Sequence, residues 1–355
     1  MIRVLHVIWN LAGGGAERVV LDLCRRAPPG IACTVQPIAP GGGLAAGFAA
    51  AGVAVLPPVL RGRRVGPATL ARLHAVVRRH DVVHTHLWAG DTWGRLAGRM
   101  ARRPVLTTEH NARPDASWRG VVSQLMAPLS DRVVFVSAAA AAAAGGRPGH
   151  RQVVPNGVDL GHHVPSPLPK GLPPRVLFLG RLVPQKGPDI LLDALTIMRG
   201  PAGLEVRIVG EGPMRARLAS HPAVRSGRVV LHDWLADPRE HLAWCSLVVM
   251  PSRWEGFGLV AVEALATGRP VLASNVDALP DVVGDGGWGV APEDPAALAR
   301  ALSAVLADPA GIRERATRGP GLARRFTLDA MVASYAEVWR ELHSGRGGAY
   351  NARDA

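Results

Sequence analysis

Two glutamates stand eight residues apart in PSRWEGFGLVAVEALATGRPV, the stretch that covers positions 251–271. Glu255 follows an apolar run typical of a buried strand, and Glu263 falls where the pattern turns helical. Taken singly, the first would be an ordinary loop carboxylate and the second a paired helix residue. Carboxylates are seldom buried without a partner, so two of them in this apolar setting need an explanation, which their spacing alone does not supply. We expect both to face a polar ligand while the aliphatic residues between them pack in the core.

Two cations flank a similar loop earlier in the chain. Arg181 and Lys186 lie in VLFLGRLVPQKG, positions 176–187, after a predicted strand and before a predicted helix. Two fixed cations at the carboxyl end of a strand can neutralise a diphosphate as it leaves. Two solvated surface cations are the plain alternative. The functional interpretation is favoured because nearly all the basic side chains of this sequence, histidine aside, are arginines. Lys186 is one of only two lysines, and the other is Lys170.

Glycine-rich turns between a strand and a helix occur in NLAGGGAER at 10–18 and in IVGEGPMRARL at 208–218. Such turns bring backbone N–H groups close to a phosphate, and the helix dipole favours the phosphate charge. A dinucleotide-binding fingerprint would need a glycine where Arg18 stands, so a nicotinamide cofactor is not indicated. A purely structural turn stays open as the alternative for both segments.

Two histidines, His84 and His86, end the apolar run DVVHTH at 81–86. A His-x-His pair can hold a metal ion, but no cysteine or carboxylate cluster accompanies it in the sequence, so we expect no metal there. The pair fits a buried or acceptor-facing strand end. The chain also lacks an Asp-x-Asp motif. That absence is consistent with cationic side chains, and not a divalent ion, acting on a leaving diphosphate.

The elements that must position these residues alternate along the chain. Continuous β-branched runs separated by helical patterns are typical of parallel sheets covered on both faces. Predicted strands cover 3–9, 33–39, 53–57, 81–86, 104–110, 132–137, 175–180, 204–210, 228–232, 246–251, 270–274 and 288–292. Predicted helices include 16–26, 67–79, 186–199, 259–268 and 295–307. The pattern predicts an α/β protein with two Rossmann-like, doubly wound domains that face a central cleft and bind ligands at the carboxyl ends of their strands.

The domain boundary falls in DLGHHVPSPLPKGLPP at 159–174, which is rich in proline and glycine. The segment 326–342 has the pattern of an amphipathic helix and follows the last predicted strand without a strand of its own. The alanine-rich segment 138–146 is explained by a helix that Ser137 caps. We expect four segments: an amino-terminal domain at 1–160, a linker at 161–174, a carboxyl-terminal domain at 175–325 and a disordered tail at 344–355.

The 355 residues suffice for two domains, and 41 basic against 28 acidic side chains leave a formal net charge of +13. A basic surface favours anionic partners, although the arginine content also fits the drift of a GC-rich genome. The basic segments lack the aromatic signature of RNA binding, so we expect a phosphorylated ligand or an anionic membrane face and no nucleic acid. Three cysteines without C-x-x-C spacing, and the lack of an apolar run of bilayer length, favour a cytoplasmic protein.

Several motifs recur in a single order. The Gly13-Gly14-Gly15 turn is followed by VVHTH (82–86), TTEHN (107–111), VPNGVD (154–159), LGRLVPQKG (179–187), GEGP (210–213) and the pair Glu255 and Glu263. This ordered set spans nearly the whole chain and resembles the retaining GT-B glycosyltransferases of glycosyltransferase family 4. A lone pair of glutamates at this spacing is common, whereas the complete set is highly specific. The resemblance implies the GT-B fold, with the 326–342 helix crossing back to the first domain.

The resemblance also implies roles for individual residues. Arg181 and Lys186 would hold the donor diphosphate, Glu263 the ribose hydroxyls, and Glu255 the hydroxyls of the transferred sugar. His110 would lie across the cleft against that sugar. The other donor-binding positions would be Gly14, Gly15, Gly210, Glu211, Asp233, Trp234, Phe257, Gly258 and Leu259, and those on the acceptor side His84, His86, Glu109 and Asn111.

The expected activity is retaining transfer of a sugar from a nucleotide-diphosphate sugar, with UDP as the expected nucleotide, to a hydroxyl acceptor and without a cofactor. Such an enzyme would serve cell-surface polysaccharide, glycolipid or metabolite glycosylation in the cytoplasm, with the inner membrane face as a second expected location. Retention through a short-lived ion pair and retention through a covalent intermediate on Glu255 both stay open. The alternatives are a sugar-nucleotide epimerase of the same architecture, for which no further acid–base motif is found, and a non-catalytic nucleotide-sugar-binding protein.

Overall fold

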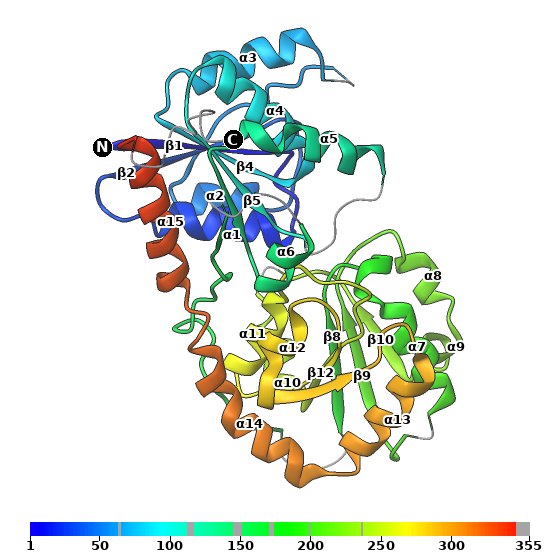
Figure 1. The fold of residues 1–355 in the computed structure, drawn as a ribbon. Helices are drawn as coiled ribbons and strands as arrows, with labels where there is room; N and C mark the ends of the chain where they lie inside the picture. Colours follow the sequence, from blue (N-terminus) through cyan, green and yellow to red (C-terminus); the bar gives the residue numbers. More distant parts are fainter. Residues whose placement is uncertain are drawn as a thin grey trace. The chain divides into compact units, whose positions relative to one another are not determined.

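The computed structural model describes residues 1–62, 65–111, 117–144, 151–169, 174–198, 200–235 and 237–345. These residues form two compact units. Unit 1 comprises Met1–Gly157 together with the segment that begins at Leu328, and unit 2 comprises Val158–Thr327. Each unit is a parallel sheet with helices packed on its faces (Figure 1). The predicted α/β class with two Rossmann-like domains is confirmed.

Unit 1 contains a seven-stranded sheet with the order β3-β2-β1-β4-β5-β6-β7. Its strands are β1 (Ile2–Ile8), β2 (Ile31–Pro37), β3 (Ala54–Val55), β4 (Val82–His86), β5 (Val105–Glu109), β6 (Arg132–Phe135) and β7 (Arg151–Val153). The strand order reverses between β1 and β4, and ligands of doubly wound sheets bind at the carboxyl ends of such a pair. The register sets His6 beside His84 and His86 beside Thr108.

The helices that follow the strands of unit 1 cover both faces of its sheet. They are α1 (Gly15–Arg25), α2 (Ala45–Ala50), α3 (Pro67–Val77), α4 (Leu87–Met100), α5 (Trp118–Met126) and α6 (Ala138–Ala143). The predicted cap of α6 is confirmed, because the Ala140 N–H donates to Ser137 Oγ at 3.1 Å. Leu5, Val7 and Val83 of the central strands pack with Leu73 of α3 and Ala97 of α4 in one buried cluster.

The last helix, α15 (Leu328–His343), belongs to unit 1 although it follows unit 2 in the chain. It packs against β1 and β4, and the side chains of Tyr335 and Trp339 are fully buried there. The Tyr335 hydroxyl lies 3.1 Å from Thr108 Oγ1, and Arg132 donates to Glu341 at 3.0 Å. The predicted return of the carboxyl-terminal helix to the first domain is confirmed.

Unit 2 contains a six-stranded parallel sheet with the order β10-β9-β8-β11-β12-β13. Its strands are β8 (Arg175–Leu179), β9 (Glu205–Val209), β10 (Val229–His232), β11 (Leu247–Met250), β12 (Val271–Ser274) and β13 (Gly287–Val290). Its helices are α7 (Pro188–Ile197), α8 (Arg215–Ala219), α9 (Pro222–Arg225), α10 (Arg239–Trp244), α11 (Leu259–Ala266), α12 (Leu279–Val283), α13 (Pro295–Leu306) and α14 (Pro309–Ala323). Here β8 and β11 form the reversal, so the loops after these two strands lie together.

The sequence analysis named no strand at β7 and no helix at the positions of α2, α4, α5, α9, α10, α12 and α14. Helix α14 contains Pro320 and several glycines, which hide its pattern, although the Gly311 N–H donates to the Asp308 carboxylate at 2.9 Å in an ordinary amino-terminal cap. Residues 170–173 of the expected linker and 346–355 of the expected tail lie outside the described residues. Among the helices that are described, none combines the length and the apolarity needed to span a membrane.

Candidate active site

Lys186 and Glu255 meet at the reversal of the second sheet. Lys186 ends a 3-10 turn, η3 (Pro184–Lys186), in the loop after β8, and Glu255 lies in the loop after β11. The Lys186 ammonium donates directly to Glu255 Oε2. The lysine side chain is 21% exposed and the glutamate side chain 8% exposed, so most of this ion pair is withdrawn from water. Two residues that the sequence places 69 positions apart therefore form one polar centre.

The backbone of the two loops explains why this pair forms. Gly187 adopts the left-handed conformation with φ of 65°, and a Cβ at this position would collide with the carbonyl oxygen of Pro251. The turn that carries Lys186 can therefore approach the end of β11 closely. The Arg253 N–H donates to the Gln185 carbonyl at 2.8 Å, and the Arg253 guanidinium binds both carboxylate oxygens of Asp189 at 3.0 and 2.9 Å. These contacts fasten one loop to the other.

Glu255 has further partners, and Arg181 is more open. The Glu255 N–H donates to Asp277 Oδ2 at 2.8 Å, and the Ser252 hydroxyl lies 3.4 Å from Glu255 Oε2. Arg181 is exposed, and its guanidinium donates to Gln185 Oε1 at 3.3 Å. The carboxyl end of β8 thus carries one neutralised cation and one exposed cation, and an incoming anion can be held by the exposed one.

Glu263 lies in α11 and is only 3% exposed. His163, which the sequence analysis assigned to the linker, is 2% exposed, and its Nε2 lies 3.9 Å from Glu263 Oε1. That both glutamates face a polar ligand stays a prediction, and in this ligand-free structure Glu255 and Glu263 are only 6% and 3% exposed. Each carboxylate is enclosed, because a lysine covers Glu255 and an imidazole borders Glu263.

The other predicted donor positions of unit 2 lie at neighbouring strand ends. Gly210 and Gly212 have φ of 147° and 154°, and a Cβ on either would collide with the carbonyl of Gly180 or of Leu182. This glycine turn after β9 therefore packs on the loop that carries Arg181. The remaining positions are exposed Glu211 and Asp233, half-buried Trp234 and Leu259, and buried Phe257 and Gly258.

Two contacts define the surroundings of these positions. Asp233 accepts an ion pair from Arg215 at 2.7 Å, so its carboxylate already has a cationic partner. The Phe257 ring lies edge-on to Phe326 with centroids 5.3 Å apart. Gly258, with φ of 97°, precedes the first turn of α11. Phe257 can therefore offer a ligand its backbone, while its ring packs in the core.

In unit 1 the glycine turn leads into α1 as predicted. Gly14 is the amino-terminal cap of this helix and Gly15 its first residue. The Glu17 side chain folds back over Gly14, where a Cβ would collide with its carboxylate. A carboxylate at this helix start is favoured by the helix dipole. The anion expected at this turn was a phosphate, whereas in this structure a carboxylate of the chain itself lies there.

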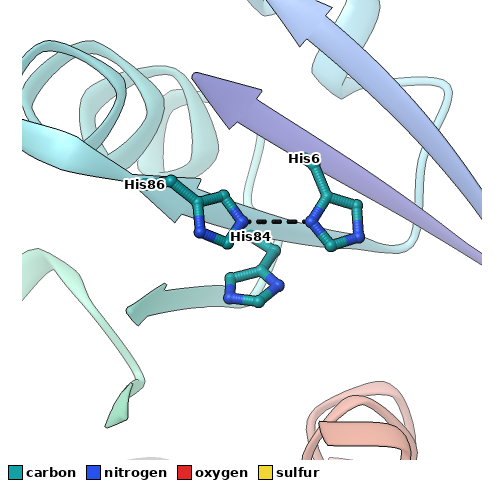
Figure 2. A group of neighbouring side chains, drawn as sticks. All are labelled: His6, His84 and His86. Atoms are coloured by element: carbon teal, nitrogen blue, oxygen red, sulfur yellow. Dashed lines mark hydrogen bonds between the residues drawn. The ribbon is translucent and has the colours of Figure 1, made fainter. Parts of the chain in front are cut away.

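The imidazoles of His6, His86 and His110 form a line that ends at His110, the residue that follows β5. His6 Nδ1 lies 3.0 Å from His86 Nε2, and His86 Nδ1 lies 3.1 Å from His110 Nε2. Figure 2 shows the first of these contacts, with the His84 ring beside it. His6, His84 and His86 are fully buried and His110 is half-buried. The sequence analysis expected His84 and His86 at a strand end that is either buried or faces the acceptor. In the structure both side chains are buried.

Burial keeps the rings of His84, His86 and His110 neutral. It lowers the pKa of His110 to about 4. Burial first, and the neighbouring imidazoles second, lower the pKa values of His84 and His86 well below the ordinary histidine value. Low dielectric surroundings disfavour the imidazolium form, so each of these three side chains is uncharged near neutral pH.

The other residues expected on the acceptor side have different surroundings. Glu109 accepts an ion pair from Arg95 at 3.3 Å, and the Arg95 side chain is 1% exposed. His84 Nε2 lies 2.8 Å from Thr108 Oγ1. Asn111 is exposed and stands at the end of a described range. Among the four, only Asn111 is fully open to solvent within the part of unit 1 that the structure describes.

The structure corrects one premise about metal binding. The sequence places no cysteine near the His-x-His pair, yet ligand atoms of His6, Cys24 and Cys33 lie within 4.8 Å of one another, and so do those of His6, His84 and His86. Neither group includes a carboxylate to offset the charge of an ion. The sequence analysis missed His6 because a single histidine inside RVLHVIW has no motif, and only the β1–β4 register brings it to His84.

The two doubly wound units, with the last helix returned to the first of them, have the GT-B fold of nucleotide-sugar glycosyltransferases. Residues 173–308 match the family model for Glycosyl transferases group 1, and residues 13–162 match that for Glycosyltransferase Family 4. The chain therefore belongs to the group 1 glycosyltransferases of glycosyltransferase family 4.

Named relatives agree with this assignment. The D-inositol 3-phosphate glycosyltransferase of Segniliparus rotundus is 32% identical, with 74% of this chain and 67% of that protein covered. The protein of the same name from Geodermatophilus obscurus is 33% identical, with 79% and 74% covered. This chain is accordingly a glycosyltransferase.

Solved structures share the fold. Anabaena HepE in complex with UDP-glucose superimposes with a TM-score of 0.84 at 23% identity, covering 96% of this chain and all of that one. Sucrose-phosphate synthase from Thermosynechococcus elongatus gives a TM-score of 0.74 at 21% identity, with 97% of this chain and all of that one covered. At such identities the similarity establishes the fold alone.

Proposed function

We propose that this glycosyltransferase moves a sugar from a UDP-sugar to a hydroxyl group of a phosphorylated polyol, with retention of anomeric configuration and without a metal ion. The observation that carries the proposal is the pairing of Lys186 with Glu255 beside exposed Arg181. A cation for the leaving diphosphate and a carboxylate for sugar hydroxyls are the groups that such a transfer requires.

The cations supply the electrostatic part of the reaction. The bond between the anomeric carbon and the diphosphate oxygen breaks, and negative charge builds on the diphosphate. Arg181 can offer a fork of donors to that oxygen-rich group, and the Lys186 ammonium has donors beyond the one that Glu255 accepts. We assign both to this charge. The acceptor oxygen forms the new bond, and its proton passes to the departing phosphate.

We assign Glu255 to positioning rather than to a covalent intermediate. Its Oε2 accepts from Lys186 and its backbone N–H is held by Asp277. A carboxylate with its charge offset in this way is a weak nucleophile but a good acceptor for sugar hydroxyls. Glu263 would bind the ribose from α11, and His110 of unit 1 would contact the transferred sugar.

The donor and acceptor assignments rest partly on the relatives. HepE has been crystallised with UDP-glucose, and UDP is therefore the first nucleotide to test. Relatives at 32–33% identity are named D-inositol 3-phosphate glycosyltransferases, which supports an inositol phosphate as the first acceptor. The net charge of +13 suits a phosphorylated acceptor as well as the donor.

Turnover assays with a donor panel test the proposal. UDP-glucose, UDP-galactose, UDP-N-acetylglucosamine and GDP-mannose are incubated with D-inositol 3-phosphate in the presence of EDTA, and products are identified by mass spectrometry. We expect one UDP-sugar to yield a glycosylated inositol phosphate. Donor epimerisation without acceptor consumption would favour the epimerase, and donor binding without any turnover the non-catalytic protein.

A specific feature of unit 1 favours contact with an anionic membrane in addition. Helix α5 presents Trp118, Val121 and Leu125 to solvent with 64%, 58% and 74% exposure. These residues recur at helical spacing on one face, and the charged residue of the helix is the cation Arg119. An exposed apolar face with a flanking cation is typical of helices that lie in the membrane interface.

Liposome co-sedimentation tests this contact. We expect the wild type to bind vesicles that contain phosphatidylglycerol more than vesicles of phosphatidylcholine alone, and Trp118→Ser/Leu125→Ser to lose most of that binding. Val230→Ser, which replaces an exposed apolar residue of unit 2, is the matched control. Equal binding to both kinds of vesicle would count against contact with a specifically anionic membrane without affecting the proposed reaction.

A further inference from the structure

The hydrogen bonds along the line of His6, His86 and His110 can be donated in one of two directions. The direction determines which ring nitrogen of His110 carries the proton. The rings of His6, His86 and His110 are joined by two nitrogen–nitrogen contacts of 3.0 and 3.1 Å. Each neutral imidazole carries a single N–H. Each contact therefore needs one donor and one acceptor, and the choice made at one ring determines the choice at the next.

Two arrangements satisfy both contacts. In the first, every ring donates from Nδ1 to the Nε2 of the next ring, and His110 keeps an Nδ1–H for another acceptor. In the second, the order is reversed, and His6 ends the line with a proton on Nε2. His6 Nε2 is buried, and the group that lies near His6 at this end of the line is the Cys33 thiol, whose sulfur is a weak acceptor and whose S–H can donate to an unprotonated nitrogen. Buried N–H groups without an acceptor are rare in proteins, whereas unfilled lone pairs are less so, and this favours the first arrangement.

The groups packed around the line leave little room for another arrangement. Trp339 of α15 meets the His6 ring edge-on at 5.6 Å, and the His84 ring lies 4.1 Å from that of His86. His84 bonds instead to Thr108, which in turn contacts the Tyr335 hydroxyl. Cys24 and Cys33 lie near His6 at the far end of the line from His110. None of these neighbouring side chains is a carboxylate, and a carboxylate is the group that would stabilise a cationic imidazolium in the line.

We propose that His6 and His86 are positioning residues that hold His110 as a neutral imidazole with its proton on Nδ1. His110 then meets its ligand as a hydrogen-bond donor and not as an acceptor or a cation. Its preferred partner is an oxygen atom, such as a hydroxyl of the transferred sugar. The ligand assignment rests on the proposed function, whereas the tautomer is a property of the ligand-free protein.

Nitrogen-15 NMR of the imidazole side chains tests the tautomer directly. In the wild type, we expect His110 to show a protonated Nδ1 and an unprotonated Nε2. In His86→Phe, which keeps a ring but removes its nitrogens, we expect His110 to shift toward the Nε2–H form that free histidine prefers. In His86→Gln the amide can both accept and donate, and we expect Nδ1–H of His110 to persist.

Kinetics distinguish positioning from mere structural support. We expect His86→Phe to lower kcat by about tenfold to a hundredfold with little change in KM for the donor, and His86→Gln to recover part of the loss. Thr108→Val is the matched control, because Thr108 contacts His84 and the Tyr335 hydroxyl. The substitution removes these buried polar contacts and leaves both contacts of the line intact. We expect it to stay within twofold of the wild type.

Three results would overturn the inference. They are an Nε2–H tautomer of His110 in the wild type, an Nδ1–H tautomer that persists unchanged in His86→Phe, and stoichiometric zinc in the purified protein that His86→Phe loses. In the last case the metal would occupy the lone pairs that the line uses. Failure to find any glycosyl transfer would refute the proposed function, and the NMR measurement would still decide the tautomer.

Discussion

The replacement of Lys186 by methionine separates the catalytic use of its charge from its structural use. The ammonium group donates to Glu255 Oε2, and the two side chains are 21% and 8% exposed. Methionine fills a similar volume without charge. The variant therefore removes a cation from the site of the leaving diphosphate and also leaves a mostly buried carboxylate without its partner.

The two effects have different magnitudes. The loss of one preorganised donor to a developing negative charge lowers kcat by about a hundredfold to a thousandfold, or about 2.7–4 kcal/mol of transition-state stabilisation. A buried carboxylate that loses its cation destabilises the fold by about 1–3 kcal/mol. In the double variant Lys186→Met/Glu255→Gln, the side chain at position 255 is a neutral amide that needs no cationic partner. We therefore expect this variant to regain stability but no activity.

Release of UDP and urea unfolding are measured in parallel on both variants. Lys186→Arg keeps a cation and is expected to retain more activity than Lys186→Met. Arg318→Met, which removes an exposed cation of α14 in the same unit, is the matched control and should leave both quantities unchanged. Activity of Lys186→Met within threefold of the wild type would refute the assignment. So would activity restored by the second substitution, because the loss would then come from stability alone.

Three further predictions concern stability. Arg269 is fully buried and donates to backbone carbonyls that include those of Ser166 and Leu242, so Arg269→Met should cost about 3 kcal/mol or more in urea unfolding; a loss below about 1 kcal/mol would contradict this. Gly187→Ala should lower both stability and kcat because its Cβ meets the Pro251 carbonyl, whereas Gly227→Ala, also left-handed but in open space, should lower stability slightly and kcat not at all. The pKa of His110 is lowered to about 4, so the unfolded chain binds a proton that the folded one does not; stability should be fully present above about pH 6.5 and fall by about 1.4 kcal/mol per pH unit for each such histidine as the pH drops toward 4, and a flat profile in calorimetry would exclude this.

The two α/β units were predictable because their strands are continuous apolar runs and their helices begin at ordinary signals. Ser137, for example, caps α6 as its position before a run of alanines indicates. Helix α14 was missed because Pro320 and glycines obscure its pattern, although its cap at Asp308 follows the usual rule. Periodicity reports the core-facing side of an element and is weak where proline and glycine abound.

The positions of the candidate site residues after their strands were predictable, and their contacts were not. Arg181, Lys186 and Glu255 stand at the carboxyl ends of strands that a doubly wound sheet brings together. The direct bond between Lys186 and Glu255 depends on the left-handed conformation of Gly187, which no spacing in the sequence reveals. His6 joins its partners only through strand register, a long-range property that a local pattern does not encode.

Proton NMR of one reaction mixture tests the central claim most directly. A UDP-sugar with an α-anomeric linkage is followed with D-inositol 3-phosphate, EDTA and the wild-type enzyme, with Lys186→Met in a parallel tube. We predict that UDP and one new α-anomeric signal on the acceptor appear in equal amounts in the first tube and at least about a hundredfold more slowly in the second. A β-anomeric product would contradict retention, and equal rates in the two tubes would contradict the site.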